Sequence, residues 1–341
     1  MSKILRKSLA SLGAAVALVA ALSSGLSAQE TKVGGLFFGD YYYITQHHDG
    51  DLKDANGFQA RRLYLTVNTK FNTNFDARVR LEAASPGDFE TAGTMTPFVK
   101  DLWVRWKQGR HSILVGLSSS PTWDVPEKEW GYRDLEKTPL DLAKLGSSRD
   151  FGIAFKGAFD EARKVEYHFM FGNGSSTKGE TNKGKKVMGA LIFHPTQALT
   201  LHAYVDREDR AGDKDRTTYE LFAGFQGDWG RLGGMWAQQT RKSPGAADVD
   251  VGLVSGYGVI KANEKVNLVA RVDRLLDPNP DAAKISWFRM SPTSKATFFL
   301  AGLDVKMAEK VHIIPNVEFV TYDDSALDSD IFLRTTFSVK F

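Results

Sequence analysis

The chain has 341 residues, of which 44 are lysine or arginine, 41 are aspartate or glutamate, and none is cysteine. The lack of cysteine excludes a disulfide framework, thiolate metal sites and cysteine catalysis. Three of the basic residues and no acidic residue lie before Glu30, so the rest of the chain is balanced (44 − 3 = 41 against 41), and its charge gives no support to nucleic-acid binding.

The first 28 residues have the composition of a secretory signal peptide. A basic start is followed by an apolar run of 14 residues, 9–22, and then by small residues up to Ala28. This order is typical of a cleaved export signal, and the run is shorter than the roughly 20 residues of a membrane-spanning helix. We expect cleavage after Ala28, or after Ser27, and a single domain over 29–341.

Apolar and polar residues then alternate with a period of two in one segment after another. Aromatic and β-branched residues are common in these segments, as they are in β-strands. The pattern predicts sixteen strands, or eighteen if a hairpin is hidden in a loop. The sixteen are expected near residues 33–46, 57–71, 75–83, 97–107, 111–118, 148–157, 164–173, 185–194, 198–207, 216–228, 230–239, 250–260, 264–276, 295–306, 309–322 and 328–341.

The connections alternate in length, since those after odd-numbered strands are mostly long and those after even-numbered strands mostly tight. Long loops at one end and short turns at the other are typical of an outer-membrane antiparallel β-barrel. In "DARVRLE" (76–82), Ala77, Val79 and Leu81 lie opposite Arg78, Arg80 and Glu82. In "KDLWVRWK" (100–107), Leu102, Val104 and Trp106 lie opposite Asp101, Trp103, Arg105 and Lys107. A lumen filled with water would hold the charged face, whereas a soluble all-β sandwich, the alternative, would turn the apolar face into its core.

The last ten residues, "FLRTTFSVKF", also alternate, with Phe337, Val339 and Phe341 on one face. Strands cross a bilayer only as a closed sheet, so this strand is expected to pair with the first one. It also has the form of a terminal strand that the outer-membrane assembly machinery recognises.

The longest connection, 119–147, follows the fifth strand, where the third long loop of sixteen-stranded porins folds inward and narrows the pore. Its length favours a functional role. We expect a constriction loop here, with an ordinary extracellular loop as the alternative. Its candidate pore residues are Trp123, Asp124, Glu127, Lys128, Trp130 and Arg133.

Four segments, "FQARRLYLTVNTKF", "VKDLWVRWK", "ILVGLSSSPTWDVPEKEWGYRDLEKT" and "GSSRDFGIAFKG", resemble corresponding segments of the phosphate-selective porin O and P family. The resemblance covers residues 57–157; beyond them it is one of strand pattern and length. It implies an outer-membrane homotrimer of sixteen-stranded barrels that passes anions, phosphate in particular, by diffusion. Such porins use a ladder of arginines and a cluster of lysines in the pore.

Alternation assigns a modest excess of basic side chains to the lumen, Arg62, Arg78, Arg80 and Arg105 chief among them. The basic set is Arg62, Lys70, Arg78, Arg80, Arg105, Lys107, Arg271, Arg334 and Lys340, and the acidic set is Glu82, Asp101, Asp206, Asp273 and Glu318. The long loop instead has two more acids than bases between Asp124 and Lys144. We therefore expect a weak preference for anions, and each lumen charge could equally serve cross-strand pairing.

Other functions have weaker support. "HHDGD" at 47–51 could hold a divalent cation, but a solvated loop is the simpler interpretation, and we expect no metal, cofactor or catalytic residue. The chain has neither G-x-S-x-G nor a phosphate-binding glycine loop. The alternatives are a channel specific for an organic acid or a sugar, with Trp123, Trp130 and Tyr132 as a stacking surface, and a non-conducting structural or adhesive barrel.

Overall fold

The computed structural model describes residues 30–341; the predicted signal peptide, 1–28, lies outside the described residues. These residues form sixteen strands, each within three residues of its predicted position at both ends. The strands are β1 (Glu30–Gln46), β2 (Asn56–Lys70), β3 (Phe75–Ala84), β4 (Thr96–Gln108), β5 (His111–Ser119), β6 (Arg149–Ala158), β7 (Val165–Gly172), β8 (Lys186–Phe193), β9 (Leu199–Glu208), β10 (Arg216–Gly227), β11 (Gly230–Arg241), β12 (Val249–Lys261), β13 (Val266–Leu275), β14 (Ala296–Ala308), β15 (Val311–Tyr322) and β16 (Asp330–Lys340).

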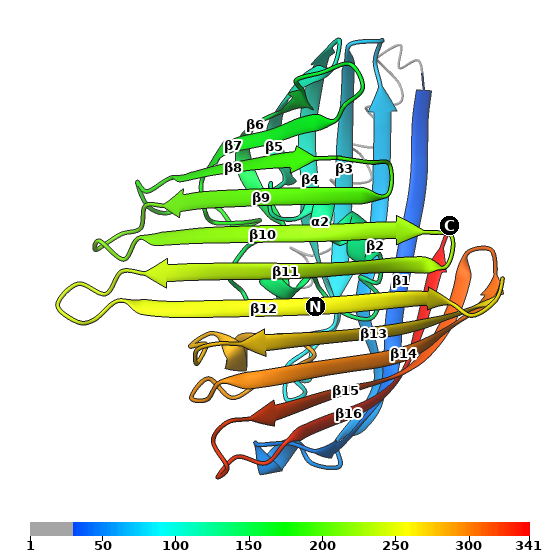
Figure 1. Cartoon of the computed structure of the whole chain (residues 1–341), viewed down its shortest axis with the longest axis vertical. Coiled ribbons are helices and arrows are strands. Elements are labelled where there is room, and N and C mark those ends of the chain that lie inside the picture. Colours follow the sequence, from blue (N-terminus) through cyan, green and yellow to red (C-terminus); the bar gives the residue numbers. More distant parts are fainter. Residues whose placement is uncertain (1–29) are drawn as a thin grey trace, which may run out of the picture.

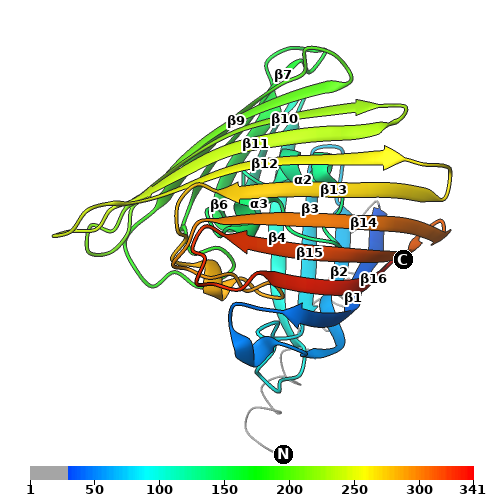
Figure 2. The ribbon, with the colours of Figure 1, turned by 60° about the horizontal axis from the view of Figure 1, so that its bottom comes forward.

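Each strand pairs antiparallel with its neighbours in the sequence, and β1 pairs with β16, so the sheet is a closed barrel. Phe37 lies opposite Val339 across this closing seam, and Gly35 exchanges two backbone hydrogen bonds with Phe341. In Figure 1 the strands of the front wall run across the view while β1 to β5 behind them run steeply, as the strand tilt of a barrel requires; Figure 2 shows β16 beside β1. The predicted fold and closure are confirmed.

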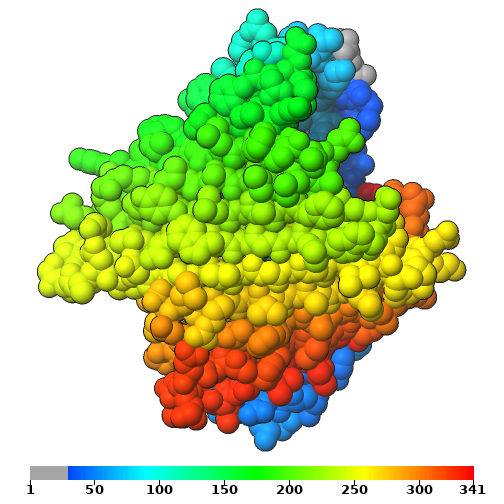
Figure 3. Space-filling view, in the orientation of Figure 1, coloured from blue at the N-terminus to red at the C-terminus, as the bar shows by residue number. Residues whose placement is uncertain are grey.

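The outer face of the wall is apolar. On β4, Leu102, Val104 and Trp106 are exposed, whereas Asp101, which directly precedes Leu102 and faces the other way, is buried. The same alternation recurs around the barrel, and Figure 3 shows the continuous wall that these strands form. Among residues 30–341, no helix has the length and apolarity needed to cross a membrane, a finding that concerns helices only. An apolar outer face of this kind suits contact with the lipid of a membrane.

The inner face is not polar throughout, as alternation alone would suggest. Buried apolar side chains of β10 to β16, such as Phe222, Leu253 and Phe298, pack with two of the long connections. One connection follows β5, and the other, 276–295, joins β13 to β14 through the 3₁₀ helix η2 (Ala282–Lys284) and contributes Phe288. Residues 286–296, "SWFRMSPTSKA", thus belong to this loop up to Lys295, and β14 begins at Ala296. The inner face is apolar here because these loops, rather than water, cover it.

Candidate functional site

The connection between β5 and β6, residues 120–148, is folded and buried; it is called the β5–β6 segment below. It contains two short helices, α2 (Asp124–Trp130) and α3 (Pro139–Leu142). Helix α2 ends at Gly131, whose φ of 67° suits glycine, and Pro139 at the start of α3 lacks only an amide hydrogen that would have no partner there. The aliphatic side chains of the segment join the apolar cluster on the wall, with Leu135 and Leu140 among the fully buried ones.

Polar contacts connect the β5–β6 segment to distant parts of the wall. Glu129 accepts a 2.9 Å hydrogen bond from Gln226 of β10. Glu136 pairs at 2.7 Å with Arg61 of β2, and both side chains are almost fully buried. Since β2 and β10 are eight positions apart in the ring of sixteen strands, the segment contacts walls on opposite sides of the barrel.

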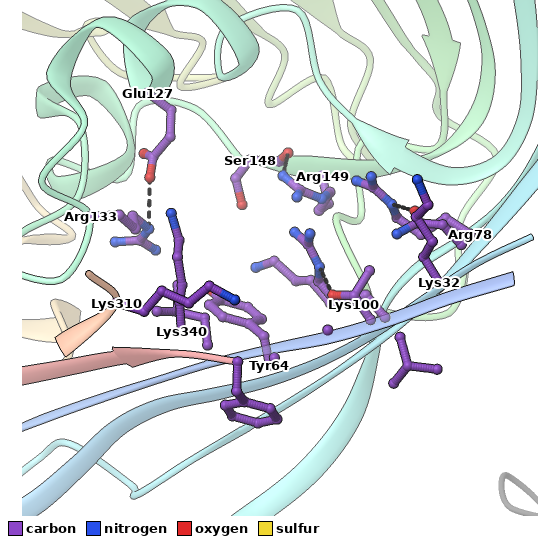
Figure 4. Close-up of a pocket in the computed structure, with 18 of the residues that line it drawn as sticks. Lys32, Tyr64, Arg78, Lys100, Glu127, Arg133, Ser148, Arg149, Lys310 and Lys340 are labelled. Carbon is purple, nitrogen blue, oxygen red and sulfur yellow. Dashed lines mark hydrogen bonds and ion pairs between the residues drawn. The ribbon is translucent and has the colours of Figure 1, made fainter. Parts of the chain in front are cut away.

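Between this segment and the strands β1 to β4 and β16 lies a cavity of about 450 Å³, called the cationic cavity below. Eight lysine or arginine side chains and a single carboxylate side chain line it (Figure 4). The charged lining residues are Lys32, Arg78, Arg80, Lys100, Arg133, Arg149, Lys310 and Lys340, together with Glu127. Figure 4 shows them converging from the strands on one side and from the segment on the other.

Three arginines share the carboxylate of Asp101. Arg149 donates to it in a short hydrogen bond, while Arg80 and Arg78 lie 3.5 and 3.8 Å away. Arg78 and Arg80 instead donate to uncharged acceptors, the side chains of Asn68 and Thr66. One carboxylate cannot neutralise three guanidinium groups, so positive charge is left on the side of Arg78 and Arg80 that faces the cavity.

A second shared carboxylate, Glu82, pairs with Arg62 and, at 3.1 Å, with Lys100. Arg133 of the segment lies 3.6 Å from Glu127 and 3.6 Å from Asp141. Around Asp101 and Glu82 together, five basic groups face two carboxylates. The cavity therefore attracts anions by an excess of charge rather than by one dedicated pair.

Aromatic rings hold several of these guanidinium groups in place. Arg149 lies over Trp123 at 4.1 Å from the ring centroid, and Arg80 lies over Tyr64 at 5.4 Å. Such cation–π contacts orient a cation without neutralising it. The wall can thus keep its arginines ordered while their charge stays available to a solute.

Two β-bulges bring in basic residues that alternation misses. The pairing of β1 with β2 shifts register at Arg61, so that Arg61 and Arg62 both turn inward and are buried. The pairing of β3 with β4 shifts at Lys100, which lines the cavity beside the inward-facing Asp101. A bulge inserts one residue and re-aims its side chain. Arg149 was missed for another reason. It is the first residue of β6, and alternation places it on the outer face with Phe151, yet its side chain is buried against Asp101.

The predicted pore residues fall into groups. Arg78, Arg80, Trp123, Glu127, Arg133 and Lys340 line the cationic cavity. Arg105, Lys107 and Asp124 line a separate cavity of about 310 Å³, where Asp76 pairs with both Arg105 and Lys107. Lys70 is exposed at the end of β2, and Lys128 is exposed on α2.

The remaining predicted residues are buried in fixed contacts. Arg62 pairs with Glu82, Arg271 pairs with Asp273 and donates to the carbonyl of Lys137, and Arg334 pairs with Asp40 and Glu318. Trp130 packs in the apolar cluster, as does Tyr132. Of the three aromatic residues of the predicted stacking surface, only Trp123 lines the cationic cavity.

Glu127 gives the cationic cavity a titratable acid near neutral pH. Burial raises the pKa of Glu127 to about 7, and nearby Asp141 adds to the rise, against the opposing charges of Arg133, Arg149 and Arg62. Below pH 7 the carboxyl group is mostly neutral, so the cavity carries more net positive charge than it does at pH 8. Burial also lowers the pKa of Lys137, on the same segment, to about 7, so the two groups shift the charge in the same direction.

We therefore expect the lumen of the barrel to prefer anions several-fold more strongly at pH 6 than at pH 8, measured as the reversal potential in a salt gradient. One unit charge about 5 Å from a solute is worth roughly 0.8 kcal/mol in water, or about fourfold. Glu127→Gln should remove at least half of this pH dependence and keep the high-selectivity state at pH 8. An unchanged pH slope in this variant would contradict the assignment.

The fold has known counterparts. No protein-family model matches the sequence, and the comparison with curated proteins likewise gave no match. An anion-selective porin from Comamonas acidovorans shares 14% identity and a TM-score of 0.68, over 92% of this chain and 99% of that porin. The outer-membrane channel DcaP of Acinetobacter baumannii has 13% identity and a TM-score of 0.66, over 92% and 97%. The trimer form of OmpT from Vibrio cholerae has 9% identity and a TM-score of 0.61, over 92% and 99%.

At these identities the comparisons show the fold, which is that of bacterial outer-membrane porins. They agree with the predicted class of sixteen-stranded barrel. The resemblance to the phosphate-selective porin O and P family stays a prediction.

Proposed function

We propose that the protein is an outer-membrane porin through which small hydrophilic solutes diffuse passively, with a preference for anions. The observation that carries this proposal is the cationic cavity, in which eight basic side chains face one carboxylate side chain. The porin fold and the apolar outer wall support the location in the outer membrane. As proposed, the protein performs no chemical conversion and needs no cofactor.

Basic residues lie at both ends of the proposed route. Lys32, Lys310 and Lys340 lie where β1 starts, where β14 turns into β15, and where β16 ends, at the short-turn end of the barrel. At the long-loop end a cavity of about 670 Å³ is lined by Lys178, Arg210, Lys214, Arg216, Arg241 and Lys242, against Glu208 and Asp209. Charge of one sign at the mouths raises the local concentration of the opposite ion.

The β5–β6 segment is proposed to be the constriction. Its contacts with β2 and with β10 support a course across the lumen. Arg133 and Glu127 on the segment and Arg78, Arg80 and Arg149 on the wall would then form the two sides of the narrow passage. Repeated weak donors let an anion exchange its water in steps without being trapped. Phosphate as the preferred anion is the finer part of this proposal and rests on the sequence resemblance.

A substrate-specific channel for an organic acid remains a second candidate, because Trp123 and Arg149 are stacked beside one another at the cavity wall. A carboxylate on an aromatic or aliphatic body would meet charge and an apolar surface together. A sugar channel has less support, since Trp130 and Tyr132 are buried. The third candidate is a non-conducting structural barrel, and the observation in its support is the extensive packing inside the barrel.

The proposed assembly is a homotrimer, as in the trimer form of OmpT from Vibrio cholerae, a structural neighbour. The expected cleaved signal peptide and recognition of β16 by the assembly machinery belong to the same proposal. Cross-linking of the protein in membranes would test the trimer.

The deciding experiment is a planar bilayer recording of the refolded protein, with single-channel conductance and reversal potential measured in a potassium chloride gradient. We expect discrete openings and an anion-selective reversal potential. Repeating the recording with phosphate, and separately with a dicarboxylate, should show which anion reduces the chloride current at millimolar concentration. Cation selectivity would overturn the anion preference, and the absence of conductance in folded protein would replace the pore with the structural barrel.

A further inference from the structure

We propose that His47, His48 and Asp330 form a binding site for a transition-metal dication such as Zn²⁺, at the long-loop end of the seam that closes the barrel. His47 and His48 directly follow β1, and Asp330 is the first residue of β16. One nitrogen or oxygen atom from each residue lies within 4.8 Å of the others. The site is distinct from the cationic cavity and does not depend on the proposed function.

The distances are close to those of a coordinated ion. Nδ1 of His48 lies 2.8 and 3.0 Å from the two carboxylate oxygens of Asp330, and Nδ1 of His47 lies 4.0 Å from Oδ1. Ligand atoms of a tetrahedral zinc ion are about 3.3 Å apart, because each bond is about 2.0–2.2 Å long. Shifts of about 1 Å in the two rings would therefore bring the three ligand atoms to the spacing of a coordinated ion. The rings already stack at 4.3 Å between centroids.

The electrostatic surroundings of Asp330 favour a cation. Its side chain is fully buried, and within residues 30–341 its ion-pair partners are His47 and His48, with no lysine or arginine among them. Asp40 and Glu318 are equally buried, and both pair with Arg334. A buried carboxylate is costly unless it is compensated, and a metal ion would supply the charge that an arginine supplies elsewhere in this barrel.

Neighbouring groups orient the proposed ligands. The hydroxyl group of Tyr322, at the end of β15, donates to Oδ2 of Asp330 and accepts a 3.0 Å hydrogen bond from the amide of Ser291. The amide of Asp49 donates to Nδ1 of His47 at 3.0 Å. The lone pair of His47 is therefore on Nδ1, and a metal ion bound at Nδ1 would replace this amide hydrogen bond. A hydrogen bond to a ligating carboxylate, such as the one that Tyr322 donates to Asp330, is typical of metal sites.

Two imidazole nitrogens and one carboxylate oxygen select the class of metal. Zn²⁺, Ni²⁺ and Cu²⁺ accept this mixed set, whereas Ca²⁺ and Mg²⁺ prefer oxygen ligands alone. The sequence "HHDGD" could not predict the third ligand, because Asp330 is 282 residues away from His48 and reaches it only through barrel closure. A bound ion would tie the first strand to the last.

Zinc binding by the refolded chain without a polyhistidine tag tests the proposal, with titration calorimetry for affinity and thermal unfolding for stability. Wild-type protein should bind one Zn²⁺ per chain and unfold at a higher temperature with Zn²⁺, and neither Ca²⁺ nor Mg²⁺ should replace it. Asp330→Asn and His48→Ala should each weaken binding at least tenfold. A variant counts as folded if, like the wild type, its unheated sample migrates differently on a gel from its heated sample. If Asp330→Asn or His48→Ala does not fold, His47→Gln serves as a milder change.

The barrel contains a matched control. His312 lies 2.7 Å from Asp304, which also accepts from the hydroxyl group of Tyr132 at 2.9 Å, so this trio repeats histidine, aspartate and tyrosine without a second histidine. His312→Ala should leave zinc binding unchanged. The proposal fails if wild-type protein shows no saturable zinc binding, or if the Asp330 and His48 variants bind as tightly as wild type.

Discussion

Replacing both Arg78 and Arg80 by glutamine is expected to lower the chloride-over-potassium permeability ratio about fifteenfold. These two arginines line the cationic cavity, and their side chains are 32% and 21% exposed, compared with 3% for Arg149. Each charge is worth roughly 0.8 kcal/mol, or about fourfold, to an anion about 5 Å away in water, so two are worth roughly fifteenfold. Asp101 keeps its bond to Arg149, so the wall should stay intact.

The control removes the same net charge elsewhere. Arg207 and Arg274 pair with Asp215 and Asp323 near the long-loop end and do not line the cationic cavity. Arg207→Gln with Arg274→Gln should change the permeability ratio less than twofold. Equal effects of the two double variants would mean that overall charge, and not the cavity, sets selectivity.

Replacing Glu136 with alanine is expected to loosen the β5–β6 segment, giving larger and noisier single-channel currents and a lower unfolding temperature. Glu136 and Arg61 are a buried pair at 2.7 Å. Breaking such a pair by removing one partner typically costs about 3–5 kcal/mol, because the other charge stays buried. Burial alone would raise the pKa of Glu136, but the charges of Arg61 and Lys137 outweigh burial and lower it to about 2. The pair is therefore ionised at any pH used for recording.

A second variant separates the lost contact from the buried charge. Arg61→Met combined with Glu136→Leu replaces both partners with apolar groups, an exchange that is often neutral or stabilising. This double variant should recover most of the stability and the wild-type conductance. If Glu136→Ala conducts and unfolds like the wild type, the segment is not held by this pair, and the constriction should be sought elsewhere.

Local chemistry in the sequence was enough to predict the barrel. Each strand has its own period-two pattern, and each tight turn its own residues, so the strand positions needed no knowledge of distant parts of the chain. Closure followed from the terminal strand, since a bilayer tolerates no open edge. The pairing of Phe37 with Val339 bears this out.

The site was predictable only in part. Alternation placed Arg78 and Arg80 on the inner face, and they line the cavity, and the length of the β5–β6 connection identified a folded segment. Alternation could not find Arg61 or Lys100, because a bulge reverses the parity that the prediction relies on.

What the sequence by itself determined is therefore the barrel class and the approximate limits of the strands, whereas the choice of sixteen over eighteen came from the structure. Only the tertiary structure decided which charges remain available: Arg334 is neutralised by Asp40, 294 residues away, whereas Arg78 and Arg80 share one carboxylate with Arg149. It also brought Asp330 to His48. The physical reason is that strand pattern is set by neighbouring residues, whereas ion pairs and ligand sets depend on distances that exist only after the sheet has closed.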